Sequence, residues 1–202
     1  MLTLYDFPTS GNCYKVRLLF AHLGIPFRRV HRDILKGETR AAEHLAINPA
    51  GKVPVVETET GARYVESGAI LWHFARGTRL LPGTVEDETR TLQWLLFEQS
   101  ALAIPLGRPR YFIKILGKGG EFKDDIAKLM PLGQQALARI ESHLAEGNPY
   151  FVGRRFSIAD IALFAYAHLA PDGGYDLAPY PAVRDWIERV RAEPGHIAID
   201  ER

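Results

Sequence analysis

The sequence predicts an α/β domain followed by a domain made only of helices. Two observations carry this prediction. Short runs of β-forming residues alternate with helical patterns as far as residue 75, and strand patterns stop at Gly77–Thr84, where proline and glycine indicate a linker. We therefore place a first domain at residues 1–77, a linker at 78–85 and an all-helical domain at 86–202.

The composition is that of an ordinary globular protein, and it argues against several classes of function. The 25 basic and 24 acidic residues nearly cancel, so we expect no nucleic acid and no membrane as a partner. No apolar stretch approaches the roughly 18–20 residues that span a bilayer, and the first residues lack the pattern of a signal peptide. The single cysteine cannot form an internal disulfide, which favours a reducing compartment, so we expect a cytoplasmic protein. The seven histidines show no metal-ligand spacing, so we expect no bound metal.

The first elements form a β–α–β unit. Leu2–Tyr5 is a short apolar strand, and Pro8–Asn12 is a tight loop that leads into a helix. The helix ends at Gly24, and Phe27–His31 is the second strand. This order favours a parallel pair of strands joined by a right-handed crossover. The core-facing stripe of the helix consists of Val16, Leu19, Phe20 and Leu23.

The following residues complete the order β-α-β-α-β-β-α. Thr39–Ala46 is a weaker helix, Lys52–Glu57 is an apolar strand, and Ala62–Glu66 is the strand that returns after a hairpin turn. A third helix opens at Ser67. This order is the thioredoxin-like pattern, a four-stranded mixed sheet flanked by helices.

Two positions in this half leave alternatives open. Pro54 stands at the head of a strand, where it cannot donate to the sheet ladder. Either the strand simply starts there, or a cis Val53–Pro54 bond leaves the backbone of Val53 free to pair with an extended ligand. Ser67 can cap its helix, or it can leave its hydroxyl and the helix N–H groups to a ligand carboxylate, with Glu66 beside it to receive an ammonium group.

The second half is a succession of helices. Glu86–Ala103 is strongly helical, and Pro105 and Pro109 are expected to kink or break what continues it. The segment Arg108–Phe112 gathers cations and aromatic rings at this break, and it either lines a pocket or forms a solvated bend. Asp124–Leu144 is a second long helix.

A very apolar helix at Ile161–Leu169 is expected to lie at the centre of the second domain. Ser157 and Asp160 precede it with the spacing of a capping box, in which Asp replaces the usual Glu or Gln. The last clear helix starts near Pro181 and stops at Pro194.

The loop Pro8–Asn12 is the strongest candidate for chemistry. It gathers hydroxyl and amide side chains beside the N–H groups of a helix start, which suits an anion or a nucleophile that must stay ionised. No His–Asp pair is spaced to activate Ser10 as in hydrolases, so we interpret Ser10 as a group that faces a bound thiol. Cys13, near the helix start, is either an activated thiol or a buried and inert one.

Four stretches recur here in a characteristic order. They are Pro8–Arg17, Asn48–Pro54, Glu66–Ile70 and Phe156–Asp160. Together they resemble the cytosolic glutathione transferase superfamily over nearly the whole chain. The resemblance is to bacterial-like members that use a serine, of theta, zeta or beta type, and it leaves the subclass open. It implies a thioredoxin-like N-terminal domain, an all-helical C-terminal domain and a homodimer.

The resemblance also implies a role for each matching position. Ser10 corresponds to the serine that donates a hydrogen bond to the glutathione sulfur, and Asn12 is its candidate second donor. The backbone of Val53, before the cis-proline position Pro54, would pair with the cysteinyl part of glutathione. The γ-glutamyl end would be held by Glu66 and Ser67, the glycyl carboxylate would be reached by Lys52 and Thr39, and an apolar pocket would be roofed by Phe7, Arg108, Tyr111 and Phe112. Ser157 and Asp160 correspond to the folding cap of the family.

The function implied by this resemblance is conjugation of glutathione, the co-substrate, to a small hydrophobic electrophile. Glutathione-dependent reduction of peroxides or disulfides would use the same thiolate, and a non-catalytic glutathione-binding module would keep the fold without turnover. The loop is also similar in spacing to that of zeta-type isomerases. Gly11 and Asn12 stand where their loop has further serine and cysteine, so isomerase activity is not expected.

Overall fold

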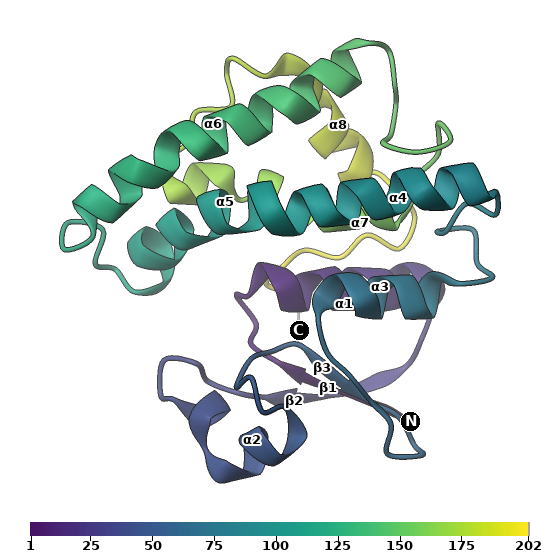
Figure 1. The fold of residues 1–202 in the computed structure, drawn as a ribbon, viewed down its shortest axis with the longest axis vertical. Helices are drawn as coiled ribbons and strands as arrows, with labels where there is room; N and C mark the ends of the chain where they lie inside the picture. The colour runs from purple at the N-terminus through teal and green to yellow at the C-terminus, as the bar shows by residue number, and fades with distance from the viewer. Residues whose placement is uncertain (202) are drawn as a thin grey trace. The chain divides into compact units, whose positions relative to one another are not determined.

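The computed structural model describes residues 1–201, which form two compact units (Figure 1). One unit comprises Met1–Phe74 together with the described residues from Pro194 onward, and the other comprises Ala75–Glu193. No helix within the described range is both long enough and apolar enough to cross a membrane.

The first unit contains a four-stranded mixed sheet with helices, which confirms the predicted fold class. Its elements are β1 (Leu2–Asp6), α1 (Gly11–Leu23), β2 (Phe27–His31), η1 (Glu38–Arg40), α2 (Ala42–Ile47), β3 (Val55–Glu57), β4 (Arg63–Tyr64) and α3 (Ser67–Ala75). The strand order is β2-β1-β3-β4, in which β1 runs parallel to β2 and antiparallel to β3. β1 is therefore internal, and its carboxyl end delivers the chain into the loop before α1.

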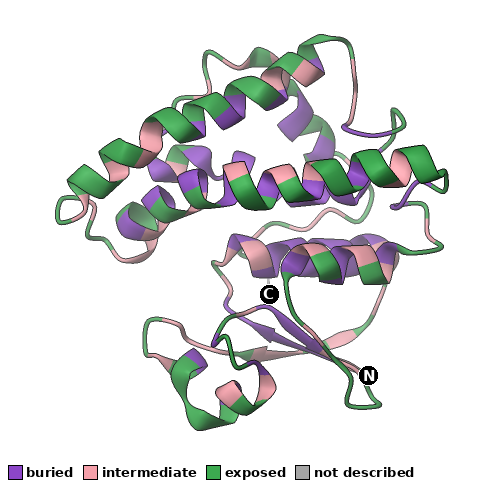
Figure 2. Ribbon diagram, viewed as in Figure 1, coloured by how far each residue is buried: buried purple, intermediate pink, exposed green. Residues whose placement is uncertain are grey.

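Helix α1 is capped at both ends and buried along most of its length. Ser10 is its N-cap, and Gly24 closes it in the left-handed conformation with φ of 63°. Most of α1 is buried (Figure 2), including two cationic side chains, Lys15 and Arg17, which are 0% and 1% exposed. More of α1 is therefore buried than the apolar stripe from which the helix was predicted.

The predicted division assigned the residues after Pro194 to the helical domain, but the structure places them against α1. Tyr14 Oη donates to the carbonyl of Ile197 at 2.7 Å, and Arg17 Nη2 donates to the carbonyl of Ile199 at 2.8 Å. Carbonyl groups of an irregular segment need donors when they leave water, and the polar side chains of α1 supply them.

Several predicted elements have different bounds. The helix predicted at Thr39–Ala46 is a 3₁₀ turn, η1, followed by the short helix α2. The strand predicted from Lys52 begins only at Val55, because a proline without an N–H precedes it. The Val53–Pro54 bond is cis, which agrees with the second of the two alternatives for this position, a cis bond and not an ordinary strand start. Ser67 is the first residue of α3 and not a cap before it, and its hydroxyl bonds to another side chain.

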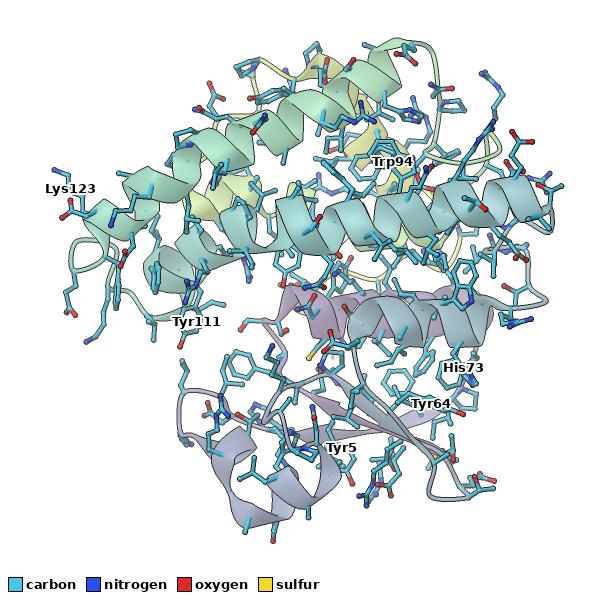
Figure 3. All side chains as sticks on the ribbon, in the orientation of Figure 1. Tyr5, Tyr64, His73, Trp94, Tyr111 and Lys123 are labelled. Carbon is cyan, nitrogen blue, oxygen red and sulfur yellow. The ribbon has the colours of Figure 1, made fainter. Side chains whose placement is uncertain are left out.

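Aromatic rings tie α3 to the edge strand and to α1. Tyr64 of β4 stacks on His73 of α3 with ring centroids 4.1 Å apart (Figure 3). Phe74 of α3 meets Tyr64 edge-on at 6.0 Å and Phe20 of α1 edge-on at 5.0 Å. These contacts hold α3 beside α1. They therefore also fix the relative position of the first turns of the two helices.

The second unit is all-helical, as predicted. Its elements are α4 (Val85–Phe97), η2 (Glu98–Leu102), α5 (Ala103–Arg110), η3 (Tyr111–Ile115), α6 (Lys123–Ala145), α7 (Ile158–Ala167), η4 (Ala170–Gly173) and α8 (Pro181–Arg191). Pro105 and Pro109 do not break the chain of helices, which differs from the expected interruption. Both lie in α5, and π-helical turns flank α5 on either side. A π turn inserts a residue into the helical ladder, which helps a helix to accommodate residues that lack an N–H.

Helix α7 is the buried centre of the second unit, as predicted, because all ten of its residues are buried. The capping box is also confirmed: Asp160 accepts hydrogen bonds from the N–H and the hydroxyl of Ser157, each at 3.0 Å. The same carboxyl group accepts from the N–H of Phe151 at 3.3 Å and from Trp186 Nε1 at 3.1 Å. Burial raises the pKa of Asp160 to about 7, although these hydrogen bonds act to lower it.

We predict that Asp160 makes the protein less stable as the pH rises. A carboxyl group whose pKa is raised on folding holds its proton more tightly in the folded state. The contribution of Asp160 to the free energy of unfolding is complete below its ordinary pKa of 3.8 and is lost as the pH rises through about 7. Between about pH 5 and 7, the free energy of unfolding in urea should fall by about 1 kcal/mol per pH unit more in the wild type than in Asp160→Asn.

The control for this prediction is Asp185→Asn, which changes an exposed carboxylate on α8. This variant should keep the pH dependence of the wild type. The same pH dependence in wild type and Asp160→Asn would contradict the prediction.

Candidate active site

The loop between β1 and α1 presents a hydroxyl group with a proton to donate. The N–H of Ser10 donates to the carbonyl of Phe7 at 2.9 Å, and Ser10 Oγ accepts from the N–H of Cys13 at 3.3 Å. A serine hydroxyl that accepts a hydrogen bond can still donate one. Ser10 is half-buried, so the cap fixes its oxygen while its proton stays available to a ligand.

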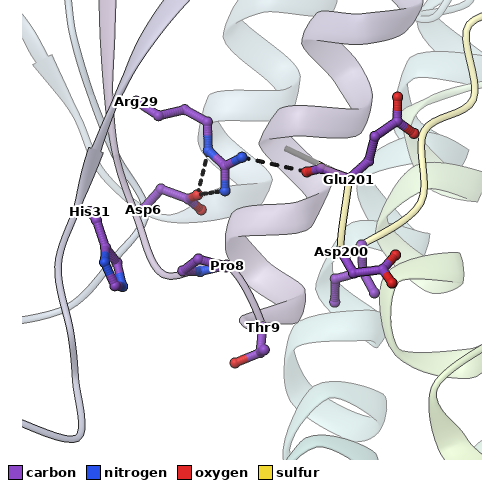
Figure 4. Close-up of a pocket in the computed structure, with 8 residues that line it drawn as sticks. Asp6, Pro8, Thr9, Arg29, His31, Asp200 and Glu201 are labelled. Carbon is purple, nitrogen blue, oxygen red and sulfur yellow. Dashed lines mark hydrogen bonds and ion pairs between the residues drawn. The ribbon is translucent and has the colours of Figure 1, made fainter.

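A buried ion pair holds this loop in place. Arg17 Nη1 donates to both carboxylate oxygens of Asp6, at 2.7 and 2.9 Å, and its Nη2 donates to the carbonyl of Pro8 at 2.8 Å. Arg29 of β2 donates to the same carboxylate from Nε at 2.9 Å (Figure 4). Burial lowers the pKa of Arg17, and the charge of Asp6 opposes that change. The turn before Ser10 therefore cannot shift without disturbing a buried charge pair.

A cavity of about 530 Å³ adjoins this loop and strand β2 (Figure 4). The ring of His31 at its wall stacks on Phe7 with centroids 6.0 Å apart. Its lining residues are Asp6, Pro8, Thr9, Arg29, His31, Ile199, Asp200 and Glu201. The first unit thus has space beside the loop, bordered by side chains of both charges.

Three polar side chains join the first turns of α1 and α3. Lys15 Nζ donates to Asn12 Oδ1 at 2.9 Å and to Ser67 Oγ at 3.3 Å, and Ser67 Oγ donates to Asn12 Oδ1 at 3.2 Å. An ammonium group has only donors, so the amide oxygen of Asn12 must face Lys15. The Asn12 NH₂ group then faces away from this cluster, and it has no hydrogen-bond partner among residues 1–201. Asn12 therefore offers a second donor two residues from Ser10.

The start of α3 is arranged to receive a charged ligand. Ser67 is 3% exposed, and its hydroxyl bonds to side chains of α1 and does not cap α3. The first N–H groups of a helix have no acceptor within it, and their partial positive charge suits a carboxylate. Glu66 is exposed and has φ of 63°, a left-handed conformation that costs a non-glycine residue of order 1 kcal/mol and often marks a ligand site. Its carboxylate is free to meet an ammonium group.

The segment before β3 presents unpaired backbone. The carbonyl of Lys52 accepts from His44 Nε2 at 3.0 Å and from Asn48 Nδ2 at 2.9 Å, and both of these side chains are buried. The N–H and C=O of Val53 have no partner within residues 1–201, so they offer a donor and an acceptor to an extended ligand. The side chain of Lys52 is exposed, whereas Thr39 is 5% exposed within η1.

The four residues expected to roof an electrophile pocket are divided between the two units. Phe7 is 7% exposed and belongs to the first unit, and the other three belong to the second. Phe112 is 9% exposed and stacks on Phe122 at 4.1 Å, with the ring of Tyr111 at 5.9 Å from its own. Arg108 is exposed on α5. Phe112 is thus mainly a core residue of its unit, and the pocket stays a prediction.

Three charged residues to which no sequence pattern assigns a role are buried around the loop. These are Asp6, Lys15 and Arg17. The apolar stripe of α1 predicts buried apolar residues, and it does not predict that Lys15 and Arg17 between and beside them are buried too. One signal was available: Asp6 ends a buried strand, where a carboxylate needs a cation, and Arg17 on the next helix is a candidate for it.

Cys13 is a buried thiol, which favours the inert one of the two alternatives left open by its position. It is 0% exposed, and its Sγ accepts from the N–H of Phe7 at 3.4 Å. Burial, with a further contribution from Asp6, raises the pKa of the thiol to about 12. The thiol therefore stays protonated at neutral pH and cannot serve as a nucleophile.

We predict that Cys13 resists labelling in the folded protein. An aromatic disulfide reagent at about pH 8 should leave the native chain unlabelled and should label one thiol per chain after unfolding in urea. The release of the coloured thiol, followed by absorbance, measures this. Rapid labelling of the native protein would show that Cys13 is reactive.

Two family models match the chain. Residues 4–77 match the model described as the glutathione S-transferase N-terminal domain, and residues 126–189 match the glutathione S-transferase C-terminal domain. The chain is 30% identical over 202 residues to the disulfide-bond oxidoreductase YfcG of Escherichia coli K12. That match covers 96% of this chain and 92% of the relative.

Solved structures agree with these matches. A glutathione S-transferase from Pseudomonas fluorescens Pf-5 is 40% identical with a TM-score of 0.96, and 99% of each chain is covered. A glutathione transferase from Burkholderia graminis, solved with two glutathione molecules bound per subunit, is 25% identical with a TM-score of 0.83. That match covers 96% of this chain and 85% of the other. Because two family models of this superfamily match the chain and similar proteins cover nearly all of it, the chain belongs to the cytosolic glutathione transferase superfamily.

Proposed function

We propose that this protein is a glutathione transferase in which Ser10 stabilises the thiolate of bound glutathione for attack on a small hydrophobic electrophile. Membership of the family supports glutathione binding together with transferase or disulfide-oxidoreductase activity. One observation carries the finer proposal. Ser10 Oγ accepts from the N–H of Cys13, so the hydroxyl is fixed by the helix and its proton remains for the sulfur of the ligand.

The chemistry requires a lower pKa for the thiol of glutathione. A thiol with a pKa near 8.5 is only a few per cent ionised at pH 7, and the thiolate is the nucleophile. A hydrogen bond to a charged group contributes roughly 1.5–3 kcal/mol, which corresponds to about one or two pKa units. Ser10 supplies one such bond, and the NH₂ group of Asn12 and the positive end of α1 act in the same direction.

The remaining contacts distribute the tripeptide over the first unit. The unpaired backbone of Val53, next to Pro54, pairs with the cysteinyl residue. The γ-glutamyl end lies at the start of α3, where the exposed Glu66 meets its ammonium group and Ser67 meets its carboxylate. The glycyl carboxylate is held by Lys52, whose side chain is exposed, and by Thr39. As in its family, we expect the protein to act as a cytoplasmic homodimer.

Disulfide reduction is the second candidate, and the similarity to YfcG, a disulfide-bond oxidoreductase, favours it. Cys13 is too deeply buried to exchange, so the reaction would use glutathione alone. One glutathione thiolate attacks a sulfur of the substrate disulfide and displaces a thiolate, which takes a proton from water. A second glutathione thiolate attacks the resulting mixed disulfide, so the substrate is reduced to two thiols and glutathione disulfide is formed.

We predict that Ser10→Ala lowers kcat for conjugation to an activated haloarene by about 10- to 100-fold. The affinity for glutathione should change less than about threefold, because the hydroxyl acts on the charged sulfur more than on the neutral thiol. Steady-state kinetics and calorimetric binding measure the two quantities. Unchanged turnover in Ser10→Ala would exclude Ser10 from this role.

Two further variants separate the donor from the helix cap. Ser10→Asp keeps a good N-cap for α1 but places a carboxylate beside the sulfur, so the cap survives while the thiolate is disfavoured. We expect its kcat to be at least as low as that of Ser10→Ala at unchanged stability. Ser142→Ala, which removes an exposed hydroxyl on α6, should behave as wild type. Parallel assays with a mixed disulfide tell the two activities apart, and tight glutathione binding without either activity would indicate a binding module.

A further inference from the structure

Lys15 occupies a position that is costly for a cation. Its side chain is 0% exposed, and an ammonium group loses much hydration when it is buried. Its Nζ bonds to side chains in the first turns of α1 and α3, close to the partial positive charge of two helix N-termini, which disfavours a further cation. A local arrangement that works against stability in this way is expected where a ligand makes use of it.

We propose that Lys15 is a positioning residue that makes the site selective for the α-carboxylate of a γ-glutamyl group, acting through Ser67. The proposal rests on the glutathione site described above and adds to it the cation behind the carboxylate position. Lys15 Nζ lies 3.3 Å from Ser67 Oγ, so its charge stands one hydrogen bond behind the hydroxyl that meets the ligand.

The hydrogen bonds around Ser67 allow it to change partner without leaving a polar group unsatisfied. In this structure the hydroxyl accepts from Lys15 and donates to Asn12 Oδ1. When a carboxylate arrives, the hydroxyl can turn its proton to the ligand and still accept from Lys15. Asn12 Oδ1 keeps its bond from Lys15 at 2.9 Å, so the loss of the serine bond does not orphan it.

The charge of Lys15 also strengthens the hydrogen bond from Ser67 to the ligand. A hydroxyl that accepts from a cation becomes a better donor, and such polarisation is larger in a buried network than in water. Because Lys15 is buried, solvent and salt screen its ammonium group only weakly, so its effect on the Ser67 hydroxyl is preserved. Lys52 differs in this respect because its exposed ammonium group is screened by solvent and salt.

Lys15 contributes to catalysis only indirectly, by orienting the side chain of Asn12. By holding the amide oxygen of Asn12, Lys15 turns the NH₂ group of Asn12 away from the cluster. An uncharged side chain at this position would remove the donor that Asn12 and Ser67 share and would leave only the bond from Ser67 to Asn12 Oδ1. We therefore expect the ligand's carboxylate to be recognised by a preformed group, and not by a side chain that orders on binding.

The test compares three ligands by calorimetry on the full-length protein. They are glutathione, an analogue without the α-carboxylate (γ-aminobutyryl-cysteinylglycine) and an analogue without the α-amino group (glutaryl-cysteinylglycine). The ratio of Kd for the first analogue to Kd for glutathione measures selectivity for the carboxylate. In Lys15→Met, a variant of similar length without charge, this ratio should fall about tenfold. The corresponding ratio for the analogue without the amino group should stay within about twofold.

Control variants make the outcome specific. Lys15→Arg keeps the charge and should retain much of the carboxylate ratio, and Lys52→Met, the same change at an exposed lysine, should leave the ratio unaltered. If Lys15→Met weakens all three ligands by one common factor, Lys15 has only a structural role and the proposal is wrong. If wild type binds none of the three ligands, it is the proposed glutathione site that fails.

Ser67→Ala provides a test that does not depend on folding of the Lys15 variants. It removes the hydroxyl through which Lys15 is proposed to act, so it should reduce the same ratio, and adding Lys15→Met should then have little further effect on it. A carboxylate ratio in Ser67→Ala equal to that of wild type would overturn the proposal even if Lys15→Met did not fold.

Discussion

The buried ion pair between Asp6 and Arg17 is the interaction on which the first unit depends. One guanidinium binds the carboxylate at the end of β1, the carbonyl of Pro8 in the loop and the carbonyl of Ile199 near the end of the chain. Strand, loop and C-terminal segment are thus joined to α1 at one point. Since breaking a buried pair by removing one partner typically costs about 3–5 kcal/mol, this point constrains everything that the loop presents.

The candidate site follows from that constraint and from a second one. The loop delivers Ser10 to the start of α1 as its cap, and the cluster of Lys15, Asn12 and Ser67 ties the start of α3 to the same place. Two helix N-termini then present donors side by side, which is favourable for an anionic ligand such as a thiolate that carries carboxylates. Ser10, Asn12 and Ser67 are held by hydrogen bonds within the protein, so little ordering of these three side chains remains for binding.

The sequence predicted the fold class because its periodicities were strong and its turn residues were well placed. It also predicted the cap at Ser157 and Asp160, which depends on a local pattern, whereas the cis bond before Pro54 was only one of two alternatives because a proline at a strand start is compatible with either isomer. It did not predict that Lys15 would be buried, because the burial of a charge depends on what surrounds the helix and not on its own period. The predicted break at Pro105 also did not occur, because the helix is flanked by π turns that accommodate the missing N–H group of proline. These π turns have no clear sequence signature.

The proposed function depends above all on whether Ser10 lowers the pKa of the thiol of bound glutathione. Ultraviolet absorbance of the thiolate, titrated against pH in the binary complexes of wild type and Ser10→Ala, measures this pKa directly. We expect a thiol pKa below about 7 in the wild-type complex and a value about one or two units higher in Ser10→Ala. An equal thiol pKa in the two complexes, with glutathione bound in both, would show that Ser10 does not stabilise the thiolate.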